Sequence, residues 1–341
     1  MNILQPAILA CQQLLTLCQV SSEEKVAVFY ETGSRKDLVE MAHKALDNLC
    51  INYTDEIVTS KTHPDGPVIR STGSSTALDN QQEIVERLCQ ADFIIDLSVE
   101  GLMHSRATAQ LLGSGARIQN ISQEHPEILA RMVPQRDDME PVRQAVKLLR
   151  GAQHMQVRSQ SGTALEVSLI DAVSVGVWGW TDKPGTLAHW PGGLVVSFPA
   201  AGSVNGTLVL APGDVNLTFK RYMETAVTLK IADDYVVDIA GTGSDARLMK
   251  QYLQGFGEKN AYATSHVGWG INTRARYESM SMYDKQDFNG TELRALAGNF
   301  LYSTGANEFA KRFTRGHFDL PVMDCDIIID GQKVVHNGQL V

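Results

Sequence analysis

A histidine and an aspartate near the end of the chain are spaced so that they could bind one metal ion. His317 and Asp319 stand two positions apart in the run Gly-His-Phe-Asp-Leu at 316–320. In an extended segment alternate side chains share one face, so the pair can present an imidazole nitrogen and a carboxylate oxygen to one centre. Taken alone, the motif is also compatible with a simple hydrogen-bonded pair.

A second histidine strengthens the case for a metal. His266 lies in Ser-His-Val-Gly-Trp-Gly at 265–270, which we expect to form a glycine-rich turn that other backbone can approach closely. Two histidines and one carboxylate form the facial triad of non-haem ferrous oxygenases, which leaves positions open for substrate and oxygen. His266, His317 and Asp319 therefore favour an iron site.

Three segments, in order, resemble the metal-site segments of the 2,5-dihydroxypyridine 5,6-dioxygenase family. They are Ser-His-Val-Gly-Trp-Gly-Ile-Asn at 265–272, Leu-Tyr-Ser-Thr-Gly-Ala-Asn at 301–307 and Gly-His-Phe-Asp at 316–319. The resemblance covers most of the chain, and the superfamily also holds the aminopeptidase T-like metallopeptidases. It implies an Fe(II)-dependent, extradiol-type cleavage of 2,5-dihydroxypyridine by O₂ that yields N-formylmaleamate. The implied iron ligands are His266, Ser303, His317 and Asp319.

The chain departs from the peptidase pattern where those peptidases bind metal. Leu194, in Pro-Gly-Gly-Leu at 191–194, stands where they have a glutamate ligand, and His266 and Ser303 replace a second glutamate and a histidine. Two-metal hydrolysis needs two ions clamped roughly 4 Å apart, which these losses disfavour. A metal-dependent aminopeptidase stays as an alternative. So does a non-enzymatic metal- or ligand-binding protein, because fold does not fix function.

Ser303 and His104 each allow a functional and a structural interpretation. Ser303 could instead cap or turn the end of a helix that we expect over 291–301. His104 follows an expected strand at 93–97 by a short loop, which places it at a carboxyl end of a parallel sheet, where α/β domains carry their chemistry. The resemblance implies that His104 is the catalytic acid/base group, whereas a solvated loop histidine is the alternative.

We expect the substrate-binding residues to surround the metal. His189, in Ala-His-Trp-Pro-Gly at 188–192, could hydrogen-bond the substrate or only cap a turn. Arg294 could pair with an anionic ring oxygen, although an exposed helical arginine is more common. Trp180 and Trp269 could stack on a flat heteroaromatic ring, although tryptophans are core residues by default.

The elements before residue 153 indicate an α/β domain. Strand-like runs at 25–30, 93–97 and 116–121 alternate with helical patterns at 36–49, 80–88 and 139–149. This alternation implies βαβ units and a doubly wound parallel sheet. We therefore expect an α/β domain over 1–152, which contributes the loop of His104 to the active site.

The remainder, 153–341, is strand-rich and indicates an α+β metal-binding catalytic domain. Helices are expected at 244–254 and 291–301, a turn at Asn205-Gly206 and a closing hairpin over 326–335. Strands are expected at 165–170, 194–198, 207–210, 226–231 and 235–239. The run Gly-Thr-Gly-Ser-Asp-Ala at 241–246 formally matches a dinucleotide fingerprint, but no acidic residue follows about 20 positions later, so we interpret it as a helix-entry turn.

Composition limits the possible partners. The 341 residues are 43% hydrophobic and 20% charged, as in ordinary soluble domains, and a length of this kind suggests two domains. A net charge of −9 without a basic run argues against nucleic acid, and no apolar stretch approaches the roughly 18 residues of a membrane span. The five scattered cysteines and the absence of Lys or Arg before Lys25 favour the cytoplasm over secretion. We expect a cytoplasmic homo-oligomer that binds Fe²⁺, a small aromatic heterocycle and O₂, and neither nucleic acid nor a membrane.

Overall fold

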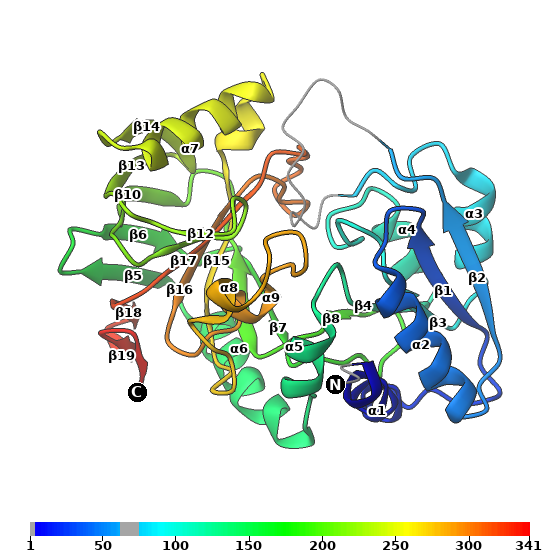
Figure 1. Ribbon diagram of the computed structural model, residues 1–341. Helices are drawn as coiled ribbons and strands as arrows, with labels where there is room; N and C mark the ends of the chain where they lie inside the picture. Colours follow the sequence, from blue (N-terminus) through cyan, green and yellow to red (C-terminus); the bar gives the residue numbers. More distant parts are fainter. Residues whose placement is uncertain (1–3, 62–74) are drawn as a thin grey trace.

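The N-terminal half is built on a parallel sheet with helices on both faces. A computed structural model describes residues 4–61 and 75–341 and shows this half beside a strand-rich half (Figure 1). All neighbouring strands of the sheet are parallel. Their order is β2 (Tyr53–Val58), β1 (Val26–Glu31), β3 (Phe93–Asp96), β4 (Arg117–Asn120) and β8 (Leu187–His189).

Alternation along β1 explains why helices cover both faces. Val28 packs into a core with α1 (Leu4–Leu17), α2 (Lys36–Asn48) and α5 (Pro126–Arg131). Phe29 packs into a second core with α3 (Gln82–Leu88) and α4 (Thr108–Gly113). Both side chains are fully buried, as expected for a strand covered on both sides. The sheet is thus doubly wound, as the sequence predicts.

The strand-rich half contains two larger antiparallel sheets that share one core. One has the order β14 (Tyr235–Ala240), β13 (Val227–Ala232), β10 (Val204–Leu210), β6 (Ala164–Ser168), β5 (His154–Ser159), β18 (Cys325–Ile329), β19 (Gln332–His336) and β20 (Gln339–Leu340). The other has the order β17 (Phe318–Val322), β16 (Phe300–Thr304), β15 (Thr264–Gly270), β9 (Leu194–Phe198) and β7 (Val173–Val177). Val157 and Leu165 of the first sheet meet Val267 and Tyr302 of the second in this core.

Short elements complete the chain. A two-stranded ribbon pairs β11 (Val215–Asn216) with β12 (Arg221–Tyr222). The remaining helices are α6 (Met139–Gly151), α7 (Ser244–Gly255), α8 (Ser279–Met282) and α9 (Thr291–Arg294), with 3₁₀ turns η1 (Arg136–Asp138) and η2 (Lys259–Tyr262). Among the residues that the structure describes, no helix is both long and apolar enough to span a membrane.

The two halves are interleaved near the expected division at residue 152. α6 lies before it but packs on β7, where a Cβ on Gly176 would come within 2.5 Å of Val142 and 2.6 Å of Val146. β8 lies beyond it but completes the N-terminal sheet by pairing with β4. Trp180 and Trp190 also pack in the N-terminal core. The chain therefore returns once to the first half before it finishes the second.

The helix expected over 291–301 and the turn expected at Asn205-Gly206 are wrong. The helix expected over 291–301 ends at Arg294, because Gly298 takes a positive φ of 86° and the aromatic and β-branched run that follows forms β16. Asn205-Gly206 is not a turn but lies inside β10. A Cβ on Gly206 would meet the carbonyl oxygen of Ala164 at 2.3 Å, so this glycine permits close approach of the neighbouring strand.

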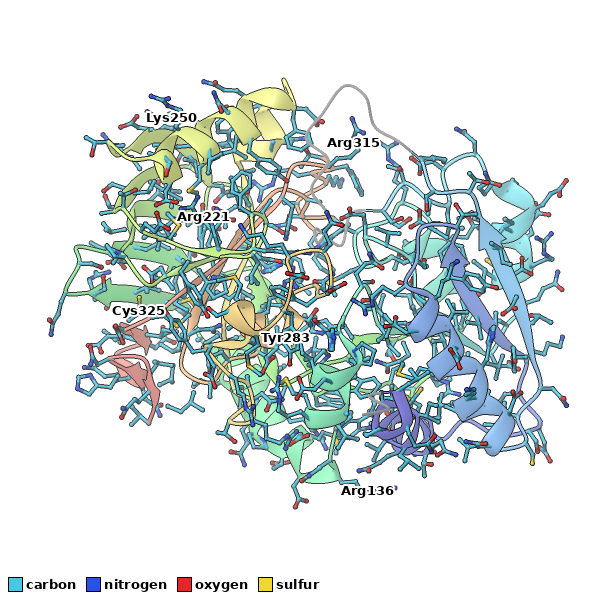
Figure 2. All side chains as sticks on the ribbon, viewed as in Figure 1. Arg136, Arg221, Lys250, Tyr283, Arg315 and Cys325 are labelled. Carbon is cyan, nitrogen blue, oxygen red and sulfur yellow. The ribbon has the colours of Figure 1, made fainter. Side chains whose placement is uncertain are left out.

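The helix-entry interpretation of 241–246 agrees with the structure. This segment leads from β14, at the edge of an antiparallel sheet, into α7. Asp245 in the first turn accepts hydrogen bonds from the backbone N–H of Glu224 at 3.0 Å and of Thr225 at 2.9 Å. The five cysteines are free thiols, and Cys325 lies in the strand-rich half (Figure 2).

Candidate metal centre

Two histidines and one aspartate of the strand-rich half converge at one point. Ligand atoms of His266, His317 and Asp319 all lie within 4.8 Å of one another, and all three residues are buried. The Nδ1 atoms of both histidines are buried and lack a hydrogen-bond partner among the described residues. Such unsatisfied nitrogens are costly, and two imidazoles beside a carboxylate form a donor set that binds cations. The residues therefore fit a metal ion.

Three adjacent strands bring these side chains together. His266 lies on β15, Ser303 on β16 and Asp319 on β17, and Ser303 stands directly opposite Asp319 in the register. The expected turn at 265–270 is wrong, because this segment is strand β15. A Cβ on Gly268 would lie 1.9 Å from the carbonyl oxygen of Val195, so the glycine lets β9 approach. The pairing of β15 with β16 shifts between Thr264 and Val267, a bulge that turns His266 relative to a regular strand.

Hydrogen bonds from other elements fix the backbone of His317. Its carbonyl oxygen accepts from the hydroxyls of Thr218 at 3.0 Å and Tyr252 at 2.9 Å. Its N–H donates to the same tyrosine oxygen at 3.1 Å. His317 Nε2 lies 3.1 Å from Asp319 Oδ1, so the two side chains share a face as the H-x-D spacing predicts.

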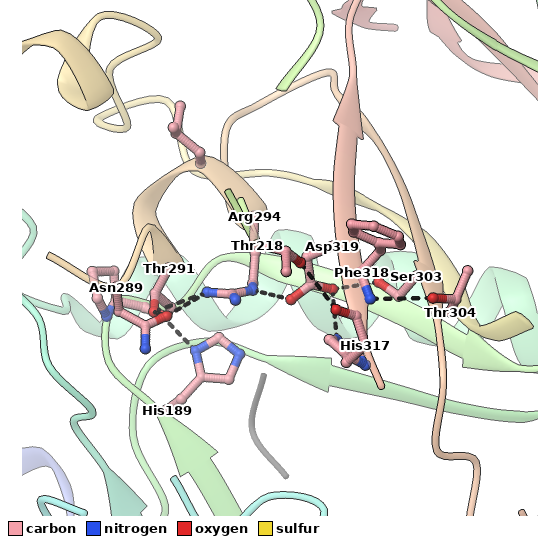
Figure 3. Close-up of polar contacts among 12 residues, drawn as sticks. His189, Thr218, Asn289, Thr291, Arg294, Ser303, Thr304, His317, Phe318 and Asp319 are labelled. Atoms are coloured by element: carbon pink, nitrogen blue, oxygen red, sulfur yellow. Dashed lines mark hydrogen bonds and ion pairs between the residues drawn. The ribbon is translucent and has the colours of Figure 1, made fainter. Parts of the chain in front are cut away.

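Arg294 and Ser303 both contact the Asp319 carboxylate (Figure 3). Arg294 Nε donates to Oδ2 at 2.5 Å, and the Ser303 hydroxyl donates to Oδ1. Burial alone raises the pKa of Asp319, but Arg294, and after it His317, hold that pKa well below its usual range. Arg294 is thus a largely buried ion-pair partner rather than an exposed helical residue. Ser303 is a strand residue and does not cap a helix.

His104 is buried beside His266 and His317. Its ring centroid lies 5.6 Å from that of His317 and 6.3 Å from that of His266. The loop that carries it is held by Asp96, at the end of β3, which accepts from the backbone N–H of Ser98 at 3.0 Å and of Leu102 at 2.7 Å. The alternative of a solvated loop histidine is therefore wrong.

His189 approaches the same region from the end of β8. Its Nδ1 lies 2.7 Å from the carbonyl oxygen of Pro191, which can only accept, so Nδ1 carries the proton. Burial lowers the pKa of His189 to about 4, so the ring is neutral at physiological pH. A neutral ring with a protonated Nδ1 leaves Nε2 as a hydrogen-bond acceptor.

These residues line one large cavity between the two halves, with a volume of about 1420 Å³. His104, His189 and Arg294 share its wall with the three metal-binding candidates. Trp180 also lines it, whereas Trp269 lies in the core of the strand-rich half. Two further lining residues, Asn289 and Glu308, have no recognisable motif in the sequence. Asn289 Oδ1 accepts from Arg294 at 2.7 Å, and Glu308 lies beside His104.

Comparisons with known proteins show the family to which the chain is similar. A family model described as 2,5-dihydroxypyridine 5,6-dioxygenase matches residues 7–341. The curated 2,5-dihydroxypyridine 5,6-dioxygenase of Pseudomonas putida KT2440 is 34% identical over 334 residues, which are 97% of this chain and 94% of that protein.

One solved structure is similar in sequence and fold, and a second is similar in fold alone. The structure of 2,5-dihydroxypyridine dioxygenase from Pseudomonas putida KT2440 superposes with a TM-score of 0.92 at 33% identity, covering 98% of this chain and 96% of that one. Wild-type AmpT from Thermus thermophilus superposes with a TM-score of 0.60 over 100% of this chain and 99% of its own. Its identity is 11%, so this second likeness concerns the fold alone.

Proposed function

The chain belongs to the 2,5-dihydroxypyridine 5,6-dioxygenase family, and from this we propose that it is an Fe(II)-dependent enzyme that opens 2,5-dihydroxypyridine between C5 and C6 to give N-formylmaleamate. The observation that carries the proposal is the buried group of His266, His317 and Asp319 beside a cavity large enough for the substrate. Two imidazoles and one carboxylate are the donor set of non-haem ferrous oxygenases. When bound, the iron would supply coordination positions for substrate and oxygen and a route for electrons between them.

His266, His317 and Asp319 would hold the metal, with Ser303 as a weaker neutral ligand or as a donor to Asp319. Leu194 and His266 stand where the peptidases have glutamate ligands. Among the described residues, His266, His317 and Asp319 form the one group of histidine, cysteine and acidic side chains that could hold a metal ion. This supports a single iron rather than the paired ions of a hydrolase. Burial lowers the pKa of His266 to about 3, so its imidazole is neutral and available for coordination.

The cavity wall supplies the groups that would orient the ring. The guanidinium of Arg294 would pair with an anionic ring oxygen, and the Nε2 of His189 would accept from a ring N–H or hydroxyl. Trp180 would offer a flat apolar surface to the heterocycle. His104 would take the proton of a ring hydroxyl, which makes the ring electron-rich enough to react with oxygen. Enclosure between the halves would keep bulk water away from the reacting atoms.

Oxygen uptake tests this function directly. The protein is loaded with Fe²⁺ under anaerobic conditions and mixed with 2,5-dihydroxypyridine and ¹⁸O₂. We expect one O₂ consumed per substrate and both labelled atoms in N-formylmaleamate. The metal-free protein and the Asp319→Asn variant serve as controls without turnover. Peptide hydrolysis with two metals per chain would instead identify an aminopeptidase, and binding without turnover would identify a binding protein. A cytoplasmic homo-oligomer is part of the same proposal, and light scattering of the purified protein measures the assembly.

A further inference from the structure

A carboxylate from the strand-rich half meets His104 from the N-terminal half. Glu308 Oε1 lies 2.8 Å from His104 Nδ1, and the two residues are 204 positions apart in the chain. The His104 side chain is 3% exposed and that of Glu308 is 32% exposed. The contact therefore joins the two halves at the wall of the cavity and is shielded from water on the imidazole side.

The loop that carries Glu308 is firmly anchored, so the contact is not an incidental surface pair. Asn307, the preceding residue, donates from its side-chain amide to the carbonyl oxygen of Pro199 at 3.0 Å. The backbones of Asn307 and Arg312 exchange hydrogen bonds at 3.0 and 2.9 Å. Arg312 in turn pairs with the buried Asp234 at 2.8 Å. These contacts hold the turn that presents the carboxylate to His104.

The chemistry of the pair decides which nitrogen of His104 carries its proton. Burial raises the pKa of Glu308, but the hydrogen bond and charge of His104 outweigh burial and lower it. The carboxylate is therefore ionised and can only accept, so Nδ1 of His104 must be the donor. In the neutral ring Nε2 then has a lone pair, and the structure gives that atom no protein partner among the described residues. A free imidazole interconverts between two tautomers, and only the one with an unprotonated Nε2 can accept a proton there.

We propose that Glu308 is a positioning residue for the reaction: it fixes His104 in the Nδ1–H tautomer and in one orientation, so that Nε2 accepts the substrate proton. This inference rests on the proposed function, because it assigns a partner to the base used there. A group that fixes the tautomer and orientation of a functional histidine is typically worth about 10- to 100-fold in activity.

A double-mutant cycle tests the proposal. Glu308→Ala should lower kcat by about 10- to 100-fold with KM and iron content close to wild type. Glu308→Gln should recover much of that loss, because its amide oxygen still accepts from Nδ1–H. In a His104→Ala background, Glu308→Ala should cost less than about twofold further, because the two residues act as one unit. Asp55→Ala removes a carboxylate that lies 2.8 Å from His43 Nε2, in a second carboxylate–histidine pair that does not line the cavity, and is the matched control, with unchanged kcat.

A spectroscopic measurement separates this inference from the function itself. In metal-free protein labelled with ¹⁵N-histidine, the His104 signals identify the tautomer above the usual imidazole pKa. Wild type should show Nδ1–H, and Glu308→Ala should shift the ring toward a mixture. An unchanged tautomer, or an equal loss of kcat from Glu308→Ala with and without His104, would overturn the proposal. A wild type without oxygen uptake would overturn the proposed function, and an unchanged kcat in His104→Ala would overturn the assignment of His104 as the base, while the tautomer still decides whether Glu308 fixes the ring.

Discussion

Replacing Ser303 by alanine separates a hydrogen bond to a buried carboxylate from metal binding. The Ser303 hydroxyl donates to Asp319 Oδ1, and neither residue is more than 3% exposed. Hydrogen bonds to charged groups contribute about 1.5–3 kcal/mol to stability. Asp319 keeps Arg294 and His317 in the variant, so its charge stays paired. We therefore expect Ser303→Ala to lower the free energy of unfolding of the metal-free protein by about 2 kcal/mol.

Ser197 offers a matched control in the same sheet. It is fully buried on β9, and its hydroxyl lies 2.7 Å from that of Ser174. Both hydroxyls are neutral, so Ser197→Ala should lower the free energy of unfolding by only about 1 kcal/mol. The two variants lose the same oxygen atom from a buried site, so the space left behind is similar. The difference between the two variants in urea titrations isolates the contribution of the charge on Asp319.

Iron content then separates the two possible roles of Ser303. A neutral hydroxyl holds a hard cation less strongly than a carboxylate or an imidazole, so Ser303→Ala should keep most of its iron while losing some turnover. Iron and kcat are measured on the same samples. A variant without iron, prepared where wild type is fully loaded, would show that the hydroxyl is an essential ligand. Equal destabilisation of the Ser303 and Ser197 variants would refute the charge-assisted hydrogen bond.

Three further perturbations address the ligands, the base and the ion pair. Alanine at His266, His317 or Asp319 should remove iron and activity together, as metal analysis and oxygen uptake on one preparation would show; an active, iron-loaded variant would exclude that ligand. His104→Ala should keep its iron and lose about 10²–10⁴-fold in kcat, with a smaller loss at high pH, where the substrate ionises unaided. A kcat equal to that of wild type would show that His104 is not the base. Arg294 contributes the largest lowering of the Asp319 pKa. A carboxyl group with a lowered pKa stabilises the folded protein at pH values above its unfolded pKa, and this stabilisation is lost as the pH falls through the folded pKa. In Arg294→Met burial then raises that pKa, so acid release of iron should begin at higher pH than in wild type, and coincident release curves would contradict this.

Local patterns predicted which side chains come together better than they predicted the helices, strands and turns of the strand-rich half. The H-x-D alternation placed His317 and Asp319 on one face because that inference needs only an extended backbone. His266 was predicted in a glycine-rich turn that other backbone can approach closely. The close approach is correct, but the segment is strand β15, because its partner strand β9 is distant in sequence and could not be inferred from the local pattern. The helix over 291–301 was wrong for a related reason, since the pairing of β16 with β15 and β17 overrides local helical periodicity.

The N-terminal half was easier to predict, because buried parallel strands and their helices follow one another in the chain. Its last strand, β8, gave no signal, since three residues cannot show a period. Glu308 was also beyond prediction. Its partner His104 is 204 positions away, and nothing within the loop at 305–316 indicates which half it faces.

The late arrival of β8 has a consequence for how the chain folds as it leaves the ribosome. Until residues 187–189 are synthesised, β4 has an open edge, and the core beneath it lacks Trp180 and Trp190. An unpaired edge strand is a site of aggregation, so a fragment that stops at residue 152 should be poorly soluble. The nascent chain must build part of the second half before the first is complete. His189, at the end of that strand, joins the cavity wall when β8 completes the sheet.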